Sequence, residues 1–241
     1  MIRDAVVMPR AMLALPANLV RDAARLVVPV ACAGCGLEDV TLCESCSAPW
    51  WEAPFRAEEG AGRLAVVGRE ALPVWAVAEL DGSPHRAIGV WKDGRRRDLD
   101  RFFARAAARA AVSVGPELPP GLLVVPVPSK PRSTRRRGVA ISALLATAVG
   151  QSLGAQVHEA LAAAGRRSKG RSSVGRWDAA GVRVTRPLGA APAFLVDDVM
   201  TTGATLARAA DALEAAGTPV IGALVLAATP RRDAFSRVGL G

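Results

Sequence analysis

The stretch FLVDDVMTTGATL, residues 194–206, decides the fold and the site predicted from this sequence. Residues 193–196 are continuously apolar and follow Pro192, which is the pattern of a buried strand in a parallel sheet. Asp197 and Asp198 come at its end, and open α/β sheets place their ligands at the carboxyl ends of strands. Residues 201–205 then form a threonine-rich turn into a helix, whose first backbone N–H groups attract a phosphate dianion. The stretch therefore predicts an anion site beside two carboxylates.

The alternative interpretation is an ordinary strand, turn and helix with two solvated aspartates. A bare pair of aspartates would favour that alternative, whereas the complete string of thirteen residues favours the site. The helix after the turn has an apolar face at helical spacing, and Gly217 with Pro219 ends it. The residues expected on that face are Leu206, Ala209, Ala210 and Leu213.

Strands alternate with helices on both sides of this stretch, which predicts an α/β fold with a mainly parallel, doubly wound sheet. Strands are expected at residues 74–80, 122–127 and 220–228, with a short edge strand near 155–161. Helices are expected at residues 84–92, 99–114 and 139–153. Residues 166–186 are polar and rich in Gly and Ser, so they are expected to form a flexible loop.

All four cysteines fall within fifteen residues, as two CxxC knuckles separated by seven residues. Two such knuckles complete a tetrahedron of thiolates, which is the pattern of a closed structural Zn²⁺ site. Gly34 and Gly36 suit the turns that a knuckle needs. A pair of disulfides is the alternative, and a cytosolic location disfavours it. The predicted zinc ligands are Cys32, Cys35, Cys43 and Cys46.

Composition and chain order give three expected parts. Residues 1–28 read as short amphipathic helices, residues 29–68 as the zinc module with an aromatic linker, and residues 69–241 as the main domain. The net charge of +9 suggests anionic partners such as nucleotide phosphates or nucleic acid. Arg10 and Pro16 interrupt the apolar N-terminal stretch, so we expect no signal peptide, no membrane span and a cytoplasmic protein.

The stretch at residues 194–206 closely resembles the signature loop of the type I phosphoribosyltransferases. The resemblance implies a site for phosphoribosyl pyrophosphate (PRPP), with the acidic pair on the ribose hydroxyls and the threonine-rich turn on the 5′-phosphate. Purine-salvage members that take hypoxanthine or guanine carry an aspartate where this chain has Thr201, and its absence argues against that specificity. The residues implied are Asp197, Asp198, Thr201, Thr202, Gly203, Ala204 and Thr205.

Three features precede this loop: the knuckles, a Lys92-x-Gly94 turn after a helix, and a PVP segment at residues 126–128. Their order resembles that of ComF-type proteins, a competence-associated phosphoribosyltransferase-like family. The resemblance covers nearly the whole chain from about residue 27. It implies PRPP bound with Mg²⁺, with Asp197 and Asp198 in the catalytic centre. The turn after Pro128, beginning at Ser129, would present backbone N–H groups to pyrophosphate. Arg137 or Arg135 would act as a charge clamp or be a solvated loop residue. Similar proteins usually carry RGFNQ-like residues where this chain has RGVAI at 137–141.

Two functions follow from these resemblances. The first is a PRPP-dependent transferase that acts on a nitrogenous base. The second is a non-enzymatic factor that binds single-stranded DNA with DNA-uptake proteins, using its arginines and exposed aromatic side chains. The aromatic candidates are Trp50, Trp51, Trp91 and Trp177, and neither His85 nor His158 is expected to be catalytic.

Overall fold

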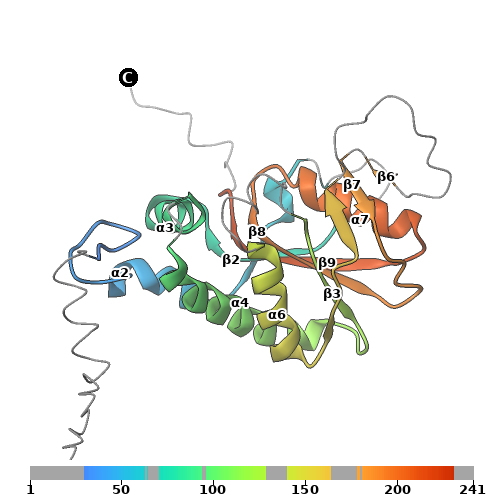
Figure 1. Ribbon diagram of the computed structural model, residues 1–241, viewed down its shortest axis with the longest axis horizontal. Coiled ribbons are helices and arrows are strands. Elements are labelled where there is room, and N and C mark those ends of the chain that lie inside the picture. Colours follow the sequence, from blue (N-terminus) through green and yellow to red (C-terminus); the bar gives the residue numbers. More distant parts are fainter. Residues whose placement is uncertain are drawn as a thin grey trace, which may run out of the picture.

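A six-stranded sheet forms the centre of the molecule (Figure 1). The computed structural model describes residues 30–62, 64, 71–93, 96–128, 140–163, 178–179 and 181–230. The strand order is β1-β2-β9-β8-β3-β4, and every pairing is parallel except that of β1 with β2. The strands are β1 (Phe55–Arg56), β2 (Val74–Glu79), β3 (Leu123–Pro126), β4 (Gln156–Val157), β8 (Ala193–Met200) and β9 (Val220–Ala228). The α/β fold with a mainly parallel sheet is thus confirmed.

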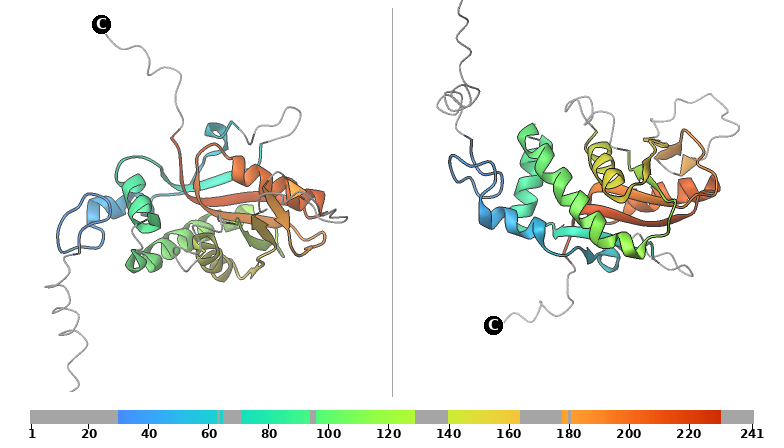
Figure 2. Two further views of the ribbon diagram at one scale, coloured as in Figure 1. Left: turned by 45° about the horizontal axis from the view of Figure 1, so that its top comes forward. Right: turned by 90° about the horizontal axis from the view of Figure 1, so that it is seen from below.

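Both faces of the sheet are covered, as in a doubly wound fold (Figure 2). Helices α3 (Gly82–Asp93), α4 (Asp100–Val114) and α6 (Ile141–Leu153) pack on one face and bury the helical core, which surrounds Phe103, Leu145 and Phe194. Helix α7 (Ala204–Ala215) packs on the other face and buries the α7 core, which surrounds Leu195, Leu206 and Leu213. A small antiparallel sheet lies beside α7, formed by β5 (Leu161–Ala163), β7 (Val182–Val184) and β6 (Asp178–Ala179).

The helices follow the predicted apolar faces. In α4 the buried residues Phe103, Ala106 and Ala110 recur at helical spacing and meet the sheet. In α7 all four residues predicted to face inward are buried, and Gly217 adopts φ +85° just after the helix end. Short 3₁₀ turns link the elements at η3 (Arg97–Leu99) and η4 (Gly115–Glu117).

Residues 48–64 do more than link two parts of the chain. After α2 (Glu44–Ser47) and η1 (Ala48–Trp51), the fully buried Trp50 enters the helical core and packs edge-on against Phe103, with ring centroids 4.8 Å apart. Strand β1 then extends the main sheet beside β2, and η2 (Glu58–Gly60) follows. Leu64 finally enters the α7 core. The segment predicted as a linker therefore contributes to the sheet and to both cores.

Two element predictions need correction. The strand predicted at residues 193–196 continues to Met200, because its ladder with β9 holds as far as the pair Met200 and Ala228. Part of the loop predicted at residues 166–186 is instead β6 and β7, where Val182 and Val184 point inward on either side of Arg183. Residues 164–177 and the predicted N-terminal helices at 1–28 lie outside the described residues.

Within the described ranges, no helix is both long and apolar enough to cross a membrane.

Candidate functional site

The acidic pair lies where β8 runs past its neighbour. Strand β3 pairs with β8 only as far as Pro126 opposite Val196, whereas β8 continues beside β9 to Met200. Asp197 and Asp198 therefore sit beyond the carboxyl end of β3, although they are still within β8. This is the edge at which open α/β sheets bind ligands.

The two carboxyl groups have different surroundings. The Asp198 carboxylate is largely buried and pairs with the Lys92 ammonium, with 2.8 Å between Oδ2 and Nζ. Asp197 Oδ1 accepts a hydrogen bond of 2.8 Å from the backbone N–H of Asp198. Burial raises the pKa of the Asp197 carboxyl well above its usual value, and the Asp198 carboxylate adds to the rise. The two carboxyl groups therefore differ in their partners, and both can contact hydroxyl groups of a ligand.

Lys92 belongs to one of the segments that carry the resemblance, but it was not predicted as a site residue. It lies in the last turn of α3, more than one hundred positions before Asp198 in the sequence. The signal that was present is its place at the end of a predicted helix, just before Gly94. Only the tertiary structure, in which α3 packs against β2 and the Lys92 side chain reaches Asp198, brings the two side chains together.

The threonine-rich turn leads directly into α7. Thr201, Thr202 and Thr205 are exposed, whereas Gly203 is buried and holds the left-handed conformation at φ +74°. Gly203 is the N-cap of a twelve-residue helix, and its carbonyl accepts the first intrahelical bond from Ala207. The Ala204 N–H donates a hydrogen bond of 3.5 Å to Thr202 Oγ1. The N–H groups in the first turn of a helix have no partner within the helix, so this turn and its exposed hydroxyls are suited to an anion.

Gly203 is also held by close packing. A Cβ atom at this position would lie 2.6 Å from Leu64 Cγ and 3.0 Å from Ala61 Cβ. Such distances exclude any side chain unless Leu64 moves. The segment after η2 therefore lies directly against the turn, and it supports the turn from the α7 core.

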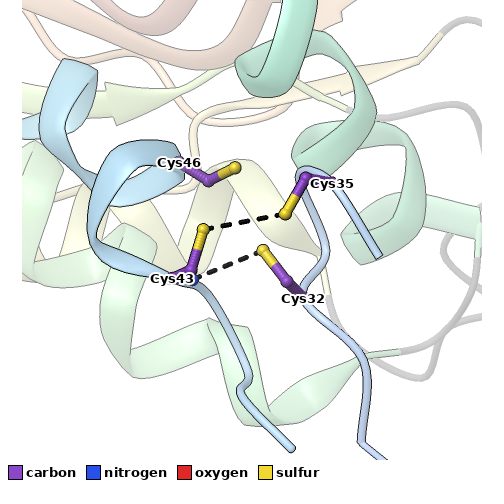
Figure 3. Close-up of side chains that lie close together, drawn as sticks. All are labelled: Cys32, Cys35, Cys43 and Cys46. Carbon is purple, nitrogen blue, oxygen red and sulfur yellow. Dashed lines mark hydrogen bonds between the residues drawn. The ribbon is translucent and has the colours of Figure 1, made fainter. Parts of the chain in front are cut away.

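The four cysteines form a compact cluster (Figure 3). Their sulfur atoms all lie within 4.8 Å of one another, and Cys35 Sγ lies 3.7 Å from Cys43 Sγ. Zn–S bonds of about 2.3 Å in a tetrahedron place sulfurs about 3.8 Å apart. All four thiols are free in the structure, and the cluster can hold a metal ion.

The thiols of the cluster shift one another's pKa values. Burial alone would raise the pKa of Cys32, but backbone N–H groups of Cys43, Cys35 and Gly34 lower it to about 6. Burial and the neighbouring sulfurs raise the pKa of Cys46 to about 12. A bound cation would stabilise all four as thiolates, because the coordinating form of cysteine is the anion.

The cluster is fastened to the main domain through two arginines. Arg86 Nε, on α3, donates a hydrogen bond of 2.5 Å to the Gly34 carbonyl. Arg96 Nη1 donates one of 2.9 Å to the Ala31 carbonyl while pairing with Asp98. A Cβ atom on Gly34 would lie 2.7 Å from Cys46 Sγ, so this glycine lets the two knuckles approach each other. The knuckles and α3 therefore form one connected unit.

The remaining predicted residues are placed only in part. Pro128 follows β3, whose extension is held by a bond from Val127 N–H to the Val196 carbonyl. Ser129, Arg135, Arg137 and Trp177 lie outside the described residues. Trp50 and Trp91 are buried, so they are not among the exposed aromatic side chains that stacking on DNA bases would need. Trp51 is 42% exposed, and it packs edge-on against Phe102.

Comparison with known proteins gives similarity in structure alone. No protein-family model and no curated protein matches the chain. Adenine phosphoribosyltransferase from Saccharomyces cerevisiae is similar over 77% of this chain and 89% of that one, at 13% identity and a TM-score of 0.39. The adenine phosphoribosyltransferase from Thermoanaerobacter pseudethanolicus is similar over 59% of this chain and 85% of that one, at 14% identity and a TM-score of 0.37.

UMP synthase from Leishmania donovani is similar over 56% of this chain, at 18% identity and a TM-score of 0.36. The match spans 24% of the length of that protein.

Proposed function

We propose that this protein binds PRPP, a phosphorylated ribose ligand, at the carboxyl end of β8. One observation carries the proposal: an acidic pair beyond the end of β3 is followed at once by a left-handed glycine and the first turn of α7. A carboxyl pair suits vicinal hydroxyl groups, and a helix start beside exposed threonines suits a phosphate dianion. The two requirements are met within nine consecutive residues of the chain.

Each part of the ligand has a proposed partner. Asp197 and Asp198 would hold the ribose hydroxyls, and residues 201–205 would hold the 5′-phosphate. Pro128 and Ser129 would lie beside the pyrophosphate, with Arg137 as a charge clamp. Mg²⁺ would neutralise pyrophosphate oxygens, which prefer a hard cation.

The proposed reaction class is transfer of the phosphoribosyl group to a ring nitrogen of a base. The C1–O bond to pyrophosphate breaks, the C1–N bond forms, and the proton of that nitrogen leaves to solvent. The protein's part is to fix the ribose and to stabilise the charge that develops on pyrophosphate. The resemblance to ComF-type proteins supports the same class, and the four-cysteine cluster would hold a structural Zn²⁺.

Isothermal titration with PRPP and Mg²⁺ tests the proposal. We expect saturable binding by the natural protein, and a loss of at least tenfold in affinity for Asp198→Asn, because a charge-assisted hydrogen bond contributes about 1.5–3 kcal/mol. Asp211→Asn is the matched control, since it makes the same change on the exposed face of α7. Equal binding by all three proteins, or none by the natural one, would refute the proposal.

The alternative function, binding of single-stranded DNA, gains no support from the described residues, because two of its four tryptophans are buried.

A further inference from the structure

Lys92 approaches the acidic pair from the face opposite α7. Helix α3 contributes Ala87, Ile88 and Trp91 to the helical core, whereas α7 packs on the other side of the sheet in the α7 core. In Figure 1, α3 and α7 lie on opposite sides of β8. The carboxyl end of β8 therefore has an anion-binding helix start on one side and an ammonium group on the other.

The Lys92 ammonium remains accessible to a ligand. Its side chain is 24% exposed, and that of Asp198 is 13% exposed. An ammonium group has three N–H donors, and the 2.8 Å contact with one carboxylate oxygen uses one of them. The group can therefore pair with Asp198 and with an anion at the same time.

The geometry of ribose then determines which group of the ligand would meet Lys92. In the ribose ring C1 and C4 flank the ring oxygen, and the hydroxyls of C2 and C3 lie on the opposite edge. If those hydroxyls contact the acidic pair, and the 5′-phosphate, carried by C5 on ring atom C4, lies at α7, the substituent of C1 points away from α7. That direction leads toward α3 and Lys92.

We propose that Lys92 is a specificity-determining residue that pairs with the pyrophosphate on C1 of the ligand and so selects PRPP over ribose 5-phosphate. This inference rests on the proposed function and adds a residue to it. Ribose 5-phosphate carries the same hydroxyls and the same 5′-phosphate, but it has no anion at C1. Lys92 would therefore contribute to the binding of one ligand and not of the other.

A purely structural role for Lys92 makes a different prediction. If the ion pair with Asp198 only held α3 in place relative to β8, its loss would disturb the acidic pair and weaken the binding of both ligands to the same extent. The ratio of the two affinities separates these roles, because changes in folding affect both affinities alike.

The experiment is calorimetric titration of PRPP, ribose 5-phosphate and inorganic pyrophosphate at fixed Mg²⁺. The variants are Lys92→Gln, Lys92→Arg and the control Arg105→Gln, which removes one exposed positive charge from α4. For Lys92→Gln we expect at least tenfold weaker binding of PRPP, about 1.4 kcal/mol, with ribose 5-phosphate unchanged within about twofold. The binding of pyrophosphate should weaken in parallel with that of PRPP. Lys92→Arg should restore most of the affinity because it keeps the charge.

The outcomes are distinguishable. If the natural protein binds neither PRPP nor ribose 5-phosphate, the proposed function fails and this inference fails with it. If the natural protein binds PRPP, and Lys92→Gln either lowers the affinity for both ligands equally or changes neither affinity, only the role of Lys92 is overturned. An equal loss of PRPP affinity in Arg105→Gln would show that net charge alone is responsible, and it would overturn the inference as well.

Discussion

Replacing Gly203 by alanine tests the packing beneath the predicted phosphate turn. A residue with a side chain at φ +74° carries about 1–2 kcal/mol of backbone strain. The new Cβ would also lie 2.6 Å from Leu64 Cγ and 3.0 Å from Ala61 Cβ, and overpacking of a buried contact costs about 1–3 kcal/mol. We therefore expect Gly203→Ala to lower the free energy of unfolding by about 2–5 kcal/mol.

The assay is urea unfolding followed by circular dichroism, together with thermal unfolding. For a chain of this size the same loss would lower Tm by between about 4 and 20 °C. Gly217→Ala is the matched control, because Gly217 also has a positive φ, +85°, but no atom lies within 4 Å of a Cβ built there. That control should show the backbone strain alone, about 1–2 kcal/mol.

A double variant isolates the contact with Leu64. Leu64→Ala alone leaves a cavity and should cost about 2–5 kcal/mol. Because it also makes room for a Cβ at residue 203, the double variant should be more stable than the sum of the single losses predicts, by about 1–3 kcal/mol. Equal losses for Gly203→Ala and Gly217→Ala, or additive losses in the double variant, would refute the reasoning.

Three further predictions concern the metal, the carboxyl pair and the tryptophan. Protein purified without chelator should contain about one zinc per chain by elemental analysis, and Cys43→Ser should lose most of it; disulfides in its place would contradict the assignment. Asp197 has a raised pKa in the folded state, so the folded protein binds more protons than the unfolded chain above about pH 4. The free energy of unfolding of the ligand-free protein should therefore fall as pH rises from that value. In urea titrations Asp197→Asn should make this free energy less dependent on pH, and the same pH dependence in the variant would contradict the prediction. Trp50→Ala should cost about 3–5 kcal/mol of unfolding free energy, while Trp51→Ala, at a half-exposed site, should cost clearly less.

The sheet and its helices could be predicted because their apolar residues recur at the periods of strands and helices. Strands β2 and β9 are almost entirely apolar, β8 begins with the apolar residues 193–196, and α4 presents Phe103, Ala106 and Ala110 on one face. These signals are local, so a single sequence carries them. The four-cysteine cluster could be predicted for the same reason, since its spacing lies within fifteen residues.

The contacts that were missed depend on tertiary structure. Strand β1 has only two residues, and β6 and β7 have two and three, which is too short for an alternating pattern to be seen. The pair between Lys92 and Asp198 joins residues over one hundred positions apart. The end of β8 was placed too early because two aspartates interrupt its apolar pattern, although the ladder with β9 continues through them.

The route of residues 50–64 limits how this protein can be divided or recombined. The chain enters one core at Trp50, passes round the outer edge of β2 as β1, and enters the opposite core at Ala57 and Leu64. The predicted boundary near residue 69 would leave both cores incomplete. A hybrid protein that exchanges the cysteine module should therefore exchange residues 30–64 as one piece. The segment that follows the cysteines packs into both cores and pairs with the sheet, so it cannot be separated from them.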